Sequence, residues 1–438
     1  MNYSDCIAYL AALGQELRGV KFDLANMRHI LAALGHPEGS YPSAIVAGTN
    51  GKGSTSAMLA SILTCSGYKT GLYTSPHLVR VNERIRVDGQ EVSNDEFASA
   101  FSKVESVVRS LLGKGVLTEC PSFFEFLTAA AFVHFRSSQV SFAVLEVGMG
   151  GRLDATNVVE PEVAVITNVD LDHTEYLGTT HAAIAAEKAG VIRSGRPVIS
   201  GCEHPDAAEV VRRHSAELGA ELVEIPVLAR VENLQAHQGR YDFDLGLNGT
   251  RFRRLQTPLQ GRFQVENTAA AVAAAWKLAE RGWRIPDEAI AEGVARAKWP
   301  GRLEVFVEEP LTLLDGAHNP AAARALAGFV SSELANRPLI LVYASMRDKA
   351  IEEISGLLFP LASKIYLTRT SQPRAATPEE LLARSRNQAQ TTIVIEPDPA
   401  QALLAARRTA PPAGVVLAAG SLFLVGALKQ ALGEGRLG

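Results

Sequence analysis

Short apolar runs alternate with helix-compatible stretches along most of this chain. Four runs end in polar sequence rich in glycine or aspartate, and they predict buried strands over 44–47, 70–73, 142–147 and 163–167. Helical periodicity predicts helices over 56–63, 94–113 and 123–136. Strand, loop and helix in alternation indicate a mostly parallel sheet whose ligands bind at the carboxyl ends of the strands.

Three further patterns complete the first part of the chain. Residues 1–40 predict two helices separated by a polar break near Arg18–Asp23. Strand-like alternation over 239–255 surrounds Asn248-Gly249, a strong signal for the turn of a peripheral hairpin. An alanine-rich helix is predicted over 264–281.

The segment Lys298-Trp299-Pro300-Gly301-Arg302 has the composition of a linker. Strands and helices alternate again after it, with strands predicted over 311–314, 339–343, 365–367, 392–395 and 415–418. The predicted fold class is α/β: a P-loop NTPase-like, mostly parallel sheet domain with a peripheral hairpin (1–297), a linker (298–302) and a smaller Rossmann-like α/β domain (303–438). Two such domains imply a cleft in which a reaction is closed off from water.

Composition narrows the class of protein. The 438 residues are 47% hydrophobic and 21% charged, which is typical of a globular protein, and a net charge of −4 without a basic tract argues against nucleic acid as a partner. Four scattered cysteines favour a reducing compartment over a disulfide framework or a zinc site. The stretch Met1–Leu17 contains Asp5 and Glu16, unlike a signal peptide, and no apolar run approaches the length of a membrane span. We therefore expect a cytoplasmic enzyme.

The most informative segment is Gly48-Thr49-Asn50-Gly51-Lys52-Gly53-Ser54-Thr55, between a predicted strand and a predicted helix. Glycines let the backbone turn N–H groups toward phosphates, and a helix N-terminus adds partial positive charge. We expect Lys52 to reach the terminal phosphates of a nucleotide and Ser54 or Thr55 to offer a hydroxyl to Mg²⁺. The usual P-loop ends in Gly-Lys-Ser/Thr, whereas Gly53 intervenes here. The alternative is a tight glycine turn without a ligand.

Four further positions combine strand or helix ends with reactive side chains. Glu146 ends an apolar strand, where a P-loop protein places a Mg²⁺-linked acid; the alternative is a salt-bridged Glu. His173, after the next strand, is a candidate metal ligand, base or capping residue. Lys188 ends a helix, where it can simply complement the helix dipole. The run 315–320, Asp-Gly-Ala-His-Asn-Pro, has the character of a site, with an Asx-type turn as the alternative. A site with Glu and His ligands beside the phosphates of ATP favours Mg²⁺ over zinc.

Together these segments resemble the folylpolyglutamate synthase/dihydrofolate synthase family of the Mur ligase superfamily, over about residues 20–430. The shared motifs are Gly-Thr-Asn-Gly-Lys-Gly-Ser at 48–54, Thr-Ser-Pro-His-Leu at 74–78, Asn-Glu-Arg-Ile at 82–85, Leu-Glu-Val-Gly-Met-Gly-Gly-Arg-Leu-Asp-Ala-Thr-Asn at 145–157, Leu-Asp-His-Thr at 171–174, Glu-Lys-Ala-Gly at 187–190, Pro-Gly-Arg-Leu-Glu at 300–304 and Asp-Gly-Ala-His-Asn-Pro at 315–320.

The resemblance implies an ATP-dependent amide ligase. ATP would phosphorylate a folate-type carboxylate, and the amino group of L-glutamate would attack the acyl phosphate, releasing ADP and phosphate. It implies Mg²⁺, in two ions, and a carbamylated Lys188 beside them. The bacterial bifunctional enzymes add glutamate both to dihydropteroate and to reduced folates, and the sequence around Arg152-Leu153 resembles theirs. The family also implies a monomer with small-molecule partners only, without nucleic acid or membrane.

The resemblance assigns roles residue by residue. The implied catalytic residues are Lys52, Lys188 and His318. The implied ATP-binding residues are Thr49, Asn50, Gly51, Lys52, Gly53, Ser54, Asn267, Arg302 and Asp315. The implied metal ligands are Ser54, Ser75, Glu146, His173 and Lys188. The implied pterin or folate contacts are Asp23, Ser122, Phe123, Phe124, Glu125, Leu153, Asp154 and Ala155, of which the two phenylalanines suit a flat aromatic substrate.

Three other functions compete with this interpretation. One is a folylpolyglutamate synthase without the first activity, and another is a Mur-type ligase acting on a cell-wall precursor. The third, from a different class, is a catalytically silent ATP-binding regulator. Such a regulator would be expected to lose Lys52, Glu146, His173 or Lys188, all of which are present.

Overall fold

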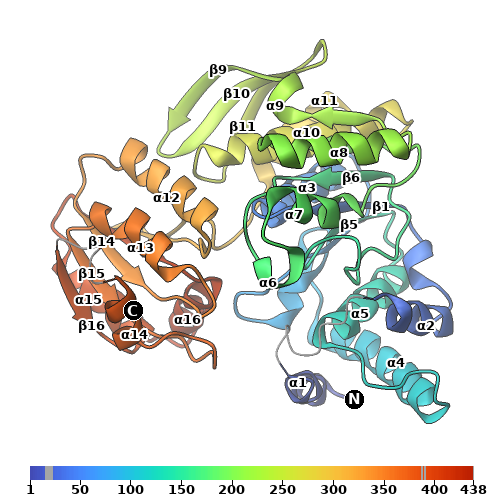
Figure 1. Cartoon of the computed structure of the whole chain (residues 1–438), viewed down its shortest axis with the longest axis horizontal. Coiled ribbons are helices and arrows are strands. Elements are labelled where there is room, and N and C mark those ends of the chain that lie inside the picture. The colour runs from blue at the N-terminus through green and yellow to red at the C-terminus, as the bar shows by residue number, and fades with distance from the viewer. Residues whose placement is uncertain (15–22, 386–387, 389–390, 438) are drawn as a thin grey trace.

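The computed structural model describes residues 1–14, 23–385, 388 and 391–437. Its strands form three sheets, of eight, three and six strands. The eight- and three-stranded sheets belong to one part of the chain, here called the N-terminal unit, and the six-stranded sheet to the C-terminal unit that follows Arg302 (Figure 1). The two units lie side by side, with α12 (Pro320–Glu333) on the side that faces the N-terminal unit.

The eight-stranded sheet is mostly parallel, in the order β4-β3-β2-β5-β1-β6-β7-β8. Its strands are β1 (Ser43–Ala47), β2 (Thr70–Tyr73), β3 (Ile85–Val87), β4 (Gln90–Glu91), β5 (Phe142–Glu146), β6 (Val163–Ile166), β7 (Val198–Ser200) and β8 (Leu222–Glu224). The antiparallel β3 and β4 close one edge of the sheet. The central position of β1, between β5 and β6, places the segment after it at the middle of the carboxyl edge.

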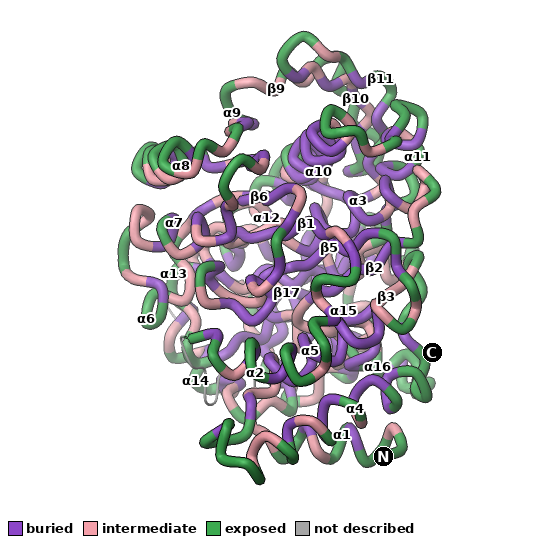
Figure 2. The backbone as a smooth tube through the Cα atoms, turned by 90° about the vertical axis from the view of Figure 1, so that its right-hand side faces the viewer, coloured by how far each residue is buried: buried purple, intermediate pink, exposed green. Residues whose placement is uncertain are grey.

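Helices cover both faces of this sheet because alternate side chains of each strand point to opposite sides. Ile45 and Ala47 join one core cluster, whereas Ala44 and Val46 join the other. The first cluster involves α1 (Tyr3–Ala12), α2 (Ala25–Ala33), α4 (Asn94–Gly113), α5 (Phe123–Ser137), α7 (His181–Ala189) and α8 (Pro205–Glu217). The second involves α3 (Lys52–Cys65), α9 (Ile225–Leu228), α10 (Phe263–Glu280) and α11 (Asp287–Arg296). Figure 2 shows the buried strands between these layers.

The three-stranded sheet, in the order β11-β10-β9, is antiparallel and packs on α10 and α11. It consists of β9 (Ala229–His237), β10 (Arg240–Leu247) and β11 (Thr250–Thr257). Asn248 and Gly249, both with positive φ, form the turn between β10 and β11. The predicted hairpin is therefore confirmed. The adjoining strand β9, which the sequence analysis did not anticipate, is mostly exposed (Figure 2).

The C-terminal unit has a six-stranded sheet in the order β12-β13-β17-β14-β15-β16, with core clusters on both faces. Its strands are β12 (Glu304–Val307), β13 (Leu311–Leu314), β14 (Leu339–Tyr343), β15 (Lys364–Leu367), β16 (Thr392–Ile395) and β17 (Val415–Ala419). Its helices are α12, α13 (Ile351–Leu358), α14 (Pro378–Ser385), α15 (Pro399–Thr409) and α16 (Leu422–Gly433). All strands pair in parallel except β12, which is antiparallel to β13.

The predicted α/β class is confirmed, and every strand predicted from an apolar run is present to within two residues. The two N-terminal helices are α1 and α2, while most of the predicted break near Arg18–Asp23 lies outside the described residues. The strands that the pattern missed, β3, β4, β7, β8, β9 and β12, are mainly short or exposed. No helix in the described ranges is long and apolar enough to span a membrane.

Candidate active site

A cavity of about 870 Å³ lies at the carboxyl edge of the eight-stranded sheet, and both units line it. It is bordered by the segments after β1, β2, β5 and β6, by the start of α10, and by the segments after β13 and β14 of the C-terminal unit. All but two of the site residues predicted from the sequence line this cavity; Phe123 and Lys188 are the exceptions. The parallel sheet thus brings together motifs that are up to about 300 residues apart in the chain, as strand-end sites do in α/β proteins.

The segment between β1 and α3 forms the expected glycine-rich turn. Gly48 and Gly51 have φ values of 147° and 82°, which side chains with a Cβ rarely adopt, and Gly51 caps the N-terminus of α3. Lys52 Nζ donates to the backbone oxygens of Gly48 (3.0 Å) and Thr49 (3.1 Å). Burial lowers the pKa of Lys52, although nearby Glu146 opposes the shift. The backbone N–H groups and the α3 N-terminus make this turn suited to binding an anion.

Gly53, the residue that departs from the usual P-loop pattern, lies against the linker. A Cβ at position 53 would stand 2.8 Å from Trp299 Nε1 and closer still to the six-membered ring. The guanidinium of Arg86 lies 5.8 Å from the centre of the same indole. The indole therefore occupies the space beside the first turn of α3 that any side chain larger than glycine would need.

Three candidate metal ligands lie at the ends of strands of the same sheet and line the cavity together. Glu146 is the last residue of β5, Ser75 follows β2, and His173 follows β6. Glu146 is only 4% exposed and accepts a hydrogen bond from Ser75 N–H (3.1 Å). Burial raises the pKa of Glu146 to about 7, against the attraction of Lys52. Burial also lowers the pKa of His173 to about 4, so that its ring is neutral and available as a ligand. A buried carboxylate, a hydroxyl and a neutral imidazole beside a phosphate-binding turn fit Mg²⁺, which prefers few protein ligands plus phosphate oxygens.

Lys188 lies behind the cavity, at the end of α7, and is 3% exposed. Burial, helped by repulsion from Lys52, lowers its pKa to about 7. The helix end is fixed by the loop after β5: Arg152 N–H donates to the Glu187 carbonyl (2.7 Å), and Gly151 lies so close to Lys188 that a Cβ would clash. The two motifs at 145–157 and 187–190 are therefore one packed structure.

The C-terminal unit contributes Arg302, Asp315 and His318 to the cavity. Asp315 accepts backbone hydrogen bonds from Leu303 and Ala317 (both 2.8 Å), and burial raises its pKa. His318 Nδ1 lies 2.8 Å from the carbonyl of Gly316, which can only accept, so Nδ1 bears the proton. Burial lowers the pKa of His318 to about 4, leaving Nε2 with a free lone pair at neutral pH. Asn267, from α10, lines the same cavity.

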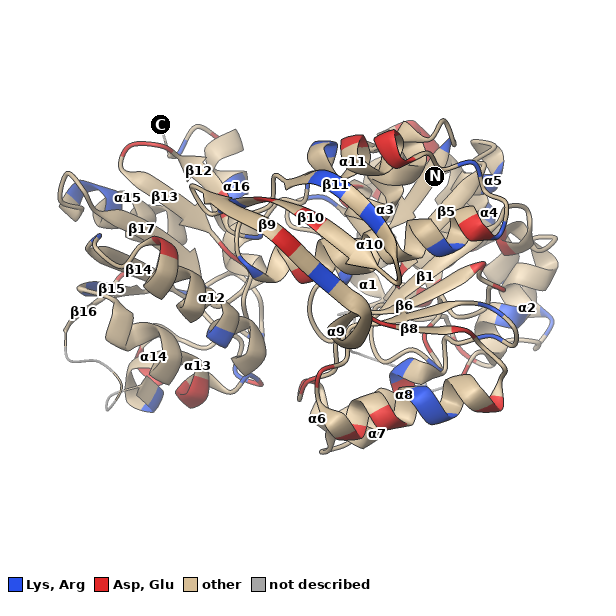
Figure 3. Ribbon diagram, turned by 90° about the horizontal axis from the view of Figure 1, so that it is seen from above, with Lys and Arg blue, Asp and Glu red and all other residues tan. Residues whose placement is uncertain are grey.

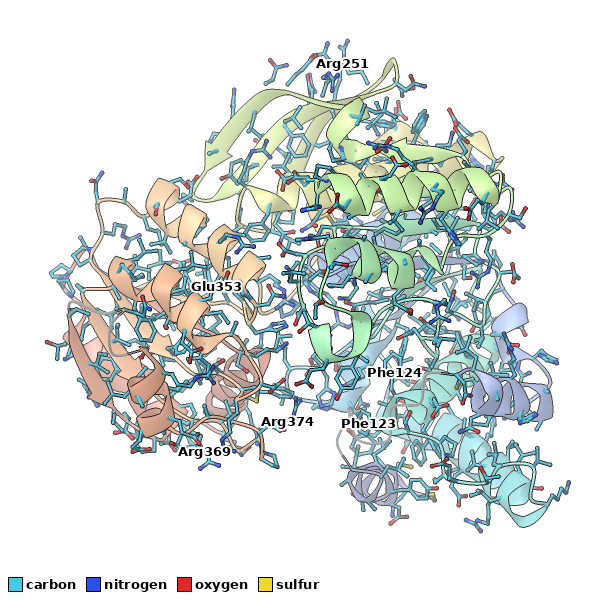
Figure 4. All side chains as sticks on the ribbon, viewed as in Figure 1. Phe123, Phe124, Arg251, Glu353, Arg369 and Arg374 are labelled. Atoms are coloured by element: carbon cyan, nitrogen blue, oxygen red, sulfur yellow. The ribbon has the colours of Figure 1, made fainter. Side chains whose placement is uncertain are left out.

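The cavity is also lined by residues expected to contact a pterin: Asp23, Ser122, Phe124, Glu125, Leu153, Asp154 and Ala155. Ser122 and Glu125 form the capping box of α5, with reciprocal backbone hydrogen bonds of 2.8 and 3.2 Å. The ring of Phe123 instead faces the guanidinium of Arg84, at 5.3 Å, and is not at the cavity surface (Figure 4 labels Phe123 and Phe124). Consecutive helix residues point about 100° apart, which separates the two rings.

Sequence reasoning did not single out Asp172, Lys349 and Arg374, which also line the cavity. Asp172 was noted only as part of the Leu-Asp-His-Thr motif. Lys349 follows the carboxyl end of β14, and the strand-end rule could have identified it. Arg374 lies farther along the chain, after β15, and pairs with Asp348 at 3.2 Å, a contact without a local sequence signal. In Figure 4 it lies on the C-terminal unit, opposite Phe124.

Charges elsewhere on the molecule are mixed in sign. Figure 3 shows Lys and Arg beside Asp and Glu on α7 and α8 as well as on the C-terminal helices.

Comparison with known proteins extends these observations. The Mur ligase middle domain model matches residues 97–275, and the model described as the Mur ligase glutamate ligase domain matches 301–422. The dihydrofolate synthase/folylpolyglutamate synthase of Bacillus subtilis is 36% identical over 367 residues, 83% of this chain and 84% of that protein. The folylpolyglutamate synthase of Lacticaseibacillus casei is 34% identical over 443 residues, covering all of both chains.

The fold agrees with these sequence relationships. The solved structure of Escherichia coli FolC in complex with DHPP and ADP superimposes with a TM-score of 0.87 at 33% identity, covering 100% of this chain and 99% of that one. The chain therefore belongs to the dihydrofolate synthase/folylpolyglutamate synthase family of Mur-type ligases.

Proposed function

We propose that this chain is an ATP-dependent ligase that joins L-glutamate to dihydropteroate, forming dihydrofolate, and to reduced folates, extending their glutamate tail. The main support is the single cavity that holds the P-loop, Glu146 and the Asp315–His318 run together. Relatives at 36% identity are named for both activities, whereas the Lacticaseibacillus casei relative is named for the second alone. The same site chemistry serves both acceptors, because each offers a carboxylate.

In the first step, a carboxylate oxygen of the folate-type substrate attacks the γ-phosphorus of ATP. The bond from that phosphorus to the β,γ-bridging oxygen breaks, giving an acyl phosphate and ADP. Catalysis of such a transfer is mainly positioning and charge neutralisation. The N–H groups of residues 49–54 and Lys52 would hold the phosphates, once Lys52 leaves the two carbonyls that it now contacts. Asn267, Arg302 and Asp315 would hold the rest of the nucleotide.

In the second step, the amino group of glutamate attacks the acyl carbon, and phosphate leaves. The amine must be neutral, so a proton has to be accepted nearby. His318 Nε2 has the free lone pair for this role, since Nδ1–H is engaged with Gly316 and the ring is neutral at pH 7. The walls of the cavity, contributed by both units, would reduce the access of water to the acyl phosphate.

Bound Mg²⁺ would neutralise the charge of the transferring phosphate oxygens. Ser75, Glu146 and His173 would hold one ion and Ser54 a second, since Ser54 is buried at the N-terminal turn of α3. A carbamate on Lys188 would turn a cation into an anion beside them. The lowered pKa of Lys188 favours this reaction, because only the neutral amine attacks carbon dioxide. We further propose that the protein is a monomer and that it is cytoplasmic; the four cysteines, which form no disulfide, are consistent with the reducing environment of that compartment.

The function is tested by product analysis. Purified protein with ATP, Mg²⁺ and L-glutamate is incubated separately with dihydropteroate and with tetrahydrofolate, and products are identified by mass spectrometry. We expect one glutamyl unit on dihydropteroate and one or more on tetrahydrofolate. Gain on tetrahydrofolate alone would leave a folylpolyglutamate synthase, and gain on neither would refute the proposal.

The carbamate is tested with ¹³C-bicarbonate. We expect a carbamate signal in the NMR spectrum that grows between about pH 6 and 8, as Lys188 loses its proton with a pKa of about 7, and that is absent in Lys188→Ala. The variant should lose about 10- to 100-fold in activity, and bicarbonate should not restore it. Full activity in Lys188→Ala would contradict the role.

The contact between Gly53 and Trp299 predicts a specific suppression. Gly53→Ala should raise the KM for ATP by about 10- to 100-fold, because the new Cβ displaces either the P-loop or the indole. Trp299→Leu added to Gly53→Ala removes the clash and should recover most of the loss. Gly433→Ala, on α16 with open space around its Cα, is the matched control and should leave the KM unchanged. A Gly53→Ala enzyme with an ordinary KM would contradict the steric account.

A further inference from the structure

The P-loop and the N-terminus of α12 exchange two side-chain amide hydrogen bonds across the boundary between the units. Asn50 Nδ2 donates to Asn319 Oδ1 (3.2 Å), and Asn319 Nδ2 donates to Asn50 Oδ1 (3.0 Å). Asn319 is 2% exposed, whereas Asn50 is partly exposed and lines the cavity, so the pair is buried on the side of the C-terminal unit. Since hydrogen bonds in a buried environment have few alternative partners, the pair links the positions of the two side chains.

Two further bonds fix the orientation of the Asn319 amide. Its Oδ1 caps α12 by accepting from Ala322 N–H (2.9 Å), and its Nδ2 also donates to Asp172 Oδ2 (2.8 Å). Exchanging the amide oxygen and nitrogen would set the nitrogen against the Ala322 N–H and the oxygen against a carboxylate. The assignment of Asn319 therefore follows from its neighbours, and the amide is fully occupied.

Asp172 continues the connection into a second segment of the C-terminal unit. Its other oxygen, Oδ1, accepts from Lys349 Nζ at 3.0 Å, and both side chains are largely buried. Lys349 belongs to the segment between β14 and α13, and it lines the same cavity as the P-loop. Asn50, Asn319, Asp172 and Lys349 thus form one continuous chain of hydrogen bonds that crosses the boundary between the units three times.

Other contacts across the boundary are weaker or farther from the P-loop. Arg324 pairs with Asp170 at 3.1 Å, but its side chain is half exposed, and exposed ion pairs contribute little. Tyr241 donates to Glu333 (3.0 Å) from the three-stranded sheet, away from the P-loop. Among these contacts, the one through Asn319 is made by a P-loop side chain, and Asn319 itself is buried.

We propose that Asn319 is a positioning residue that transmits nucleotide occupancy of the P-loop to the segment 344–352 of the C-terminal unit. A nucleotide that fixes the P-loop also fixes the side chain of Asn50. The hydrogen bonds from Asn50 through Asn319 and Asp172 to Lys349 are then held in a single arrangement. Glutamate then meets an ordered segment 344–352 only after the nucleotide has bound. This inference rests on the proposed ATP site, and it adds the element by which the two units respond to each other.

The test is hydrogen–deuterium exchange of the full chain with Mg²⁺ and a non-hydrolysable ATP analogue. In the unaltered protein, the analogue should protect both the P-loop peptide (48–55) and the peptide spanning 344–352. Asn319→Ser keeps a capping hydroxyl for α12 but loses the amide contacts. In this variant the P-loop peptide should still gain protection, and 344–352 should not.

Two matched variants separate coupling from helix capping. Asp398→Ser replaces another N-cap of the C-terminal unit, at α15 and outside the cavity, and should behave as the unaltered protein. The double variant Asp172→Asn/Asn319→Asp exchanges the amide and the carboxylate, so that an amide donor again faces a carboxylate acceptor. It should recover the protection of 344–352 that the single variant Asn319→Asp loses.

Kinetics supply an independent readout. At saturating ATP, Asn319→Ser should raise the KM for glutamate by about fivefold or more while the KM for the pteroate substrate stays within about twofold. Protection of 344–352 in Asn319→Ser equal to that of the unaltered protein would overturn the inference and leave the proposed function intact. An analogue that protects neither peptide in the unaltered protein would instead overturn the ATP site.

Discussion

The burial of charge at one edge of the eight-stranded sheet is the constraint on which the rest of the site depends. Glu146 and Lys188 are buried there and Lys52 is partly buried, and burial shifts the pKa of each in the direction that favours its neutral form. Such groups add little to the stability of a fold. Their arrangement is explained if anionic phosphates and a divalent cation are their intended partners, as a ligase that activates a carboxylate requires.

The sheet makes this arrangement possible because it is parallel. Each strand of the central group ends at the same edge, so a lysine after β1 and a glutamate at the end of β5 meet despite a separation of nearly a hundred residues. The C-terminal unit repeats the design with its own strand ends, and His318 and Lys349 approach the same cavity. The site therefore depends on how the two units lie against each other, as well as on the strand order within each sheet.

Sequence alone predicted the buried strands well, since uninterrupted apolar runs such as 142–147 allow few alternatives. It missed β3, β4 and β9, whose residues are largely at an edge and lack a periodic apolar signal. Glu146, His173 and the P-loop could be identified because their residue types follow strand ends. The separation of Phe123 from Phe124 and the network around Asn319 could not, because they depend on helix phase and on contacts between distant segments.

The departure of Gly53 from the usual P-loop pattern also depends on a contact between distant segments. Its reason lies in Trp299, almost 250 residues away, whose indole occupies the space of a side chain at position 53. The glycine at position 53 is therefore explained by a contact with a distant residue, and the P-loop sequence alone does not reveal that contact.

The central claim is that this site activates a carboxylate as an acyl phosphate, and oxygen transfer tests it most directly. A pteroate substrate labelled with ¹⁸O in its carboxylate is turned over with ATP and L-glutamate, and the released phosphate is examined by mass spectrometry. The account predicts one ¹⁸O atom per phosphate, because the oxygen that attacks the γ-phosphorus leaves with it. Phosphate without label, formed together with the amide product, would contradict it.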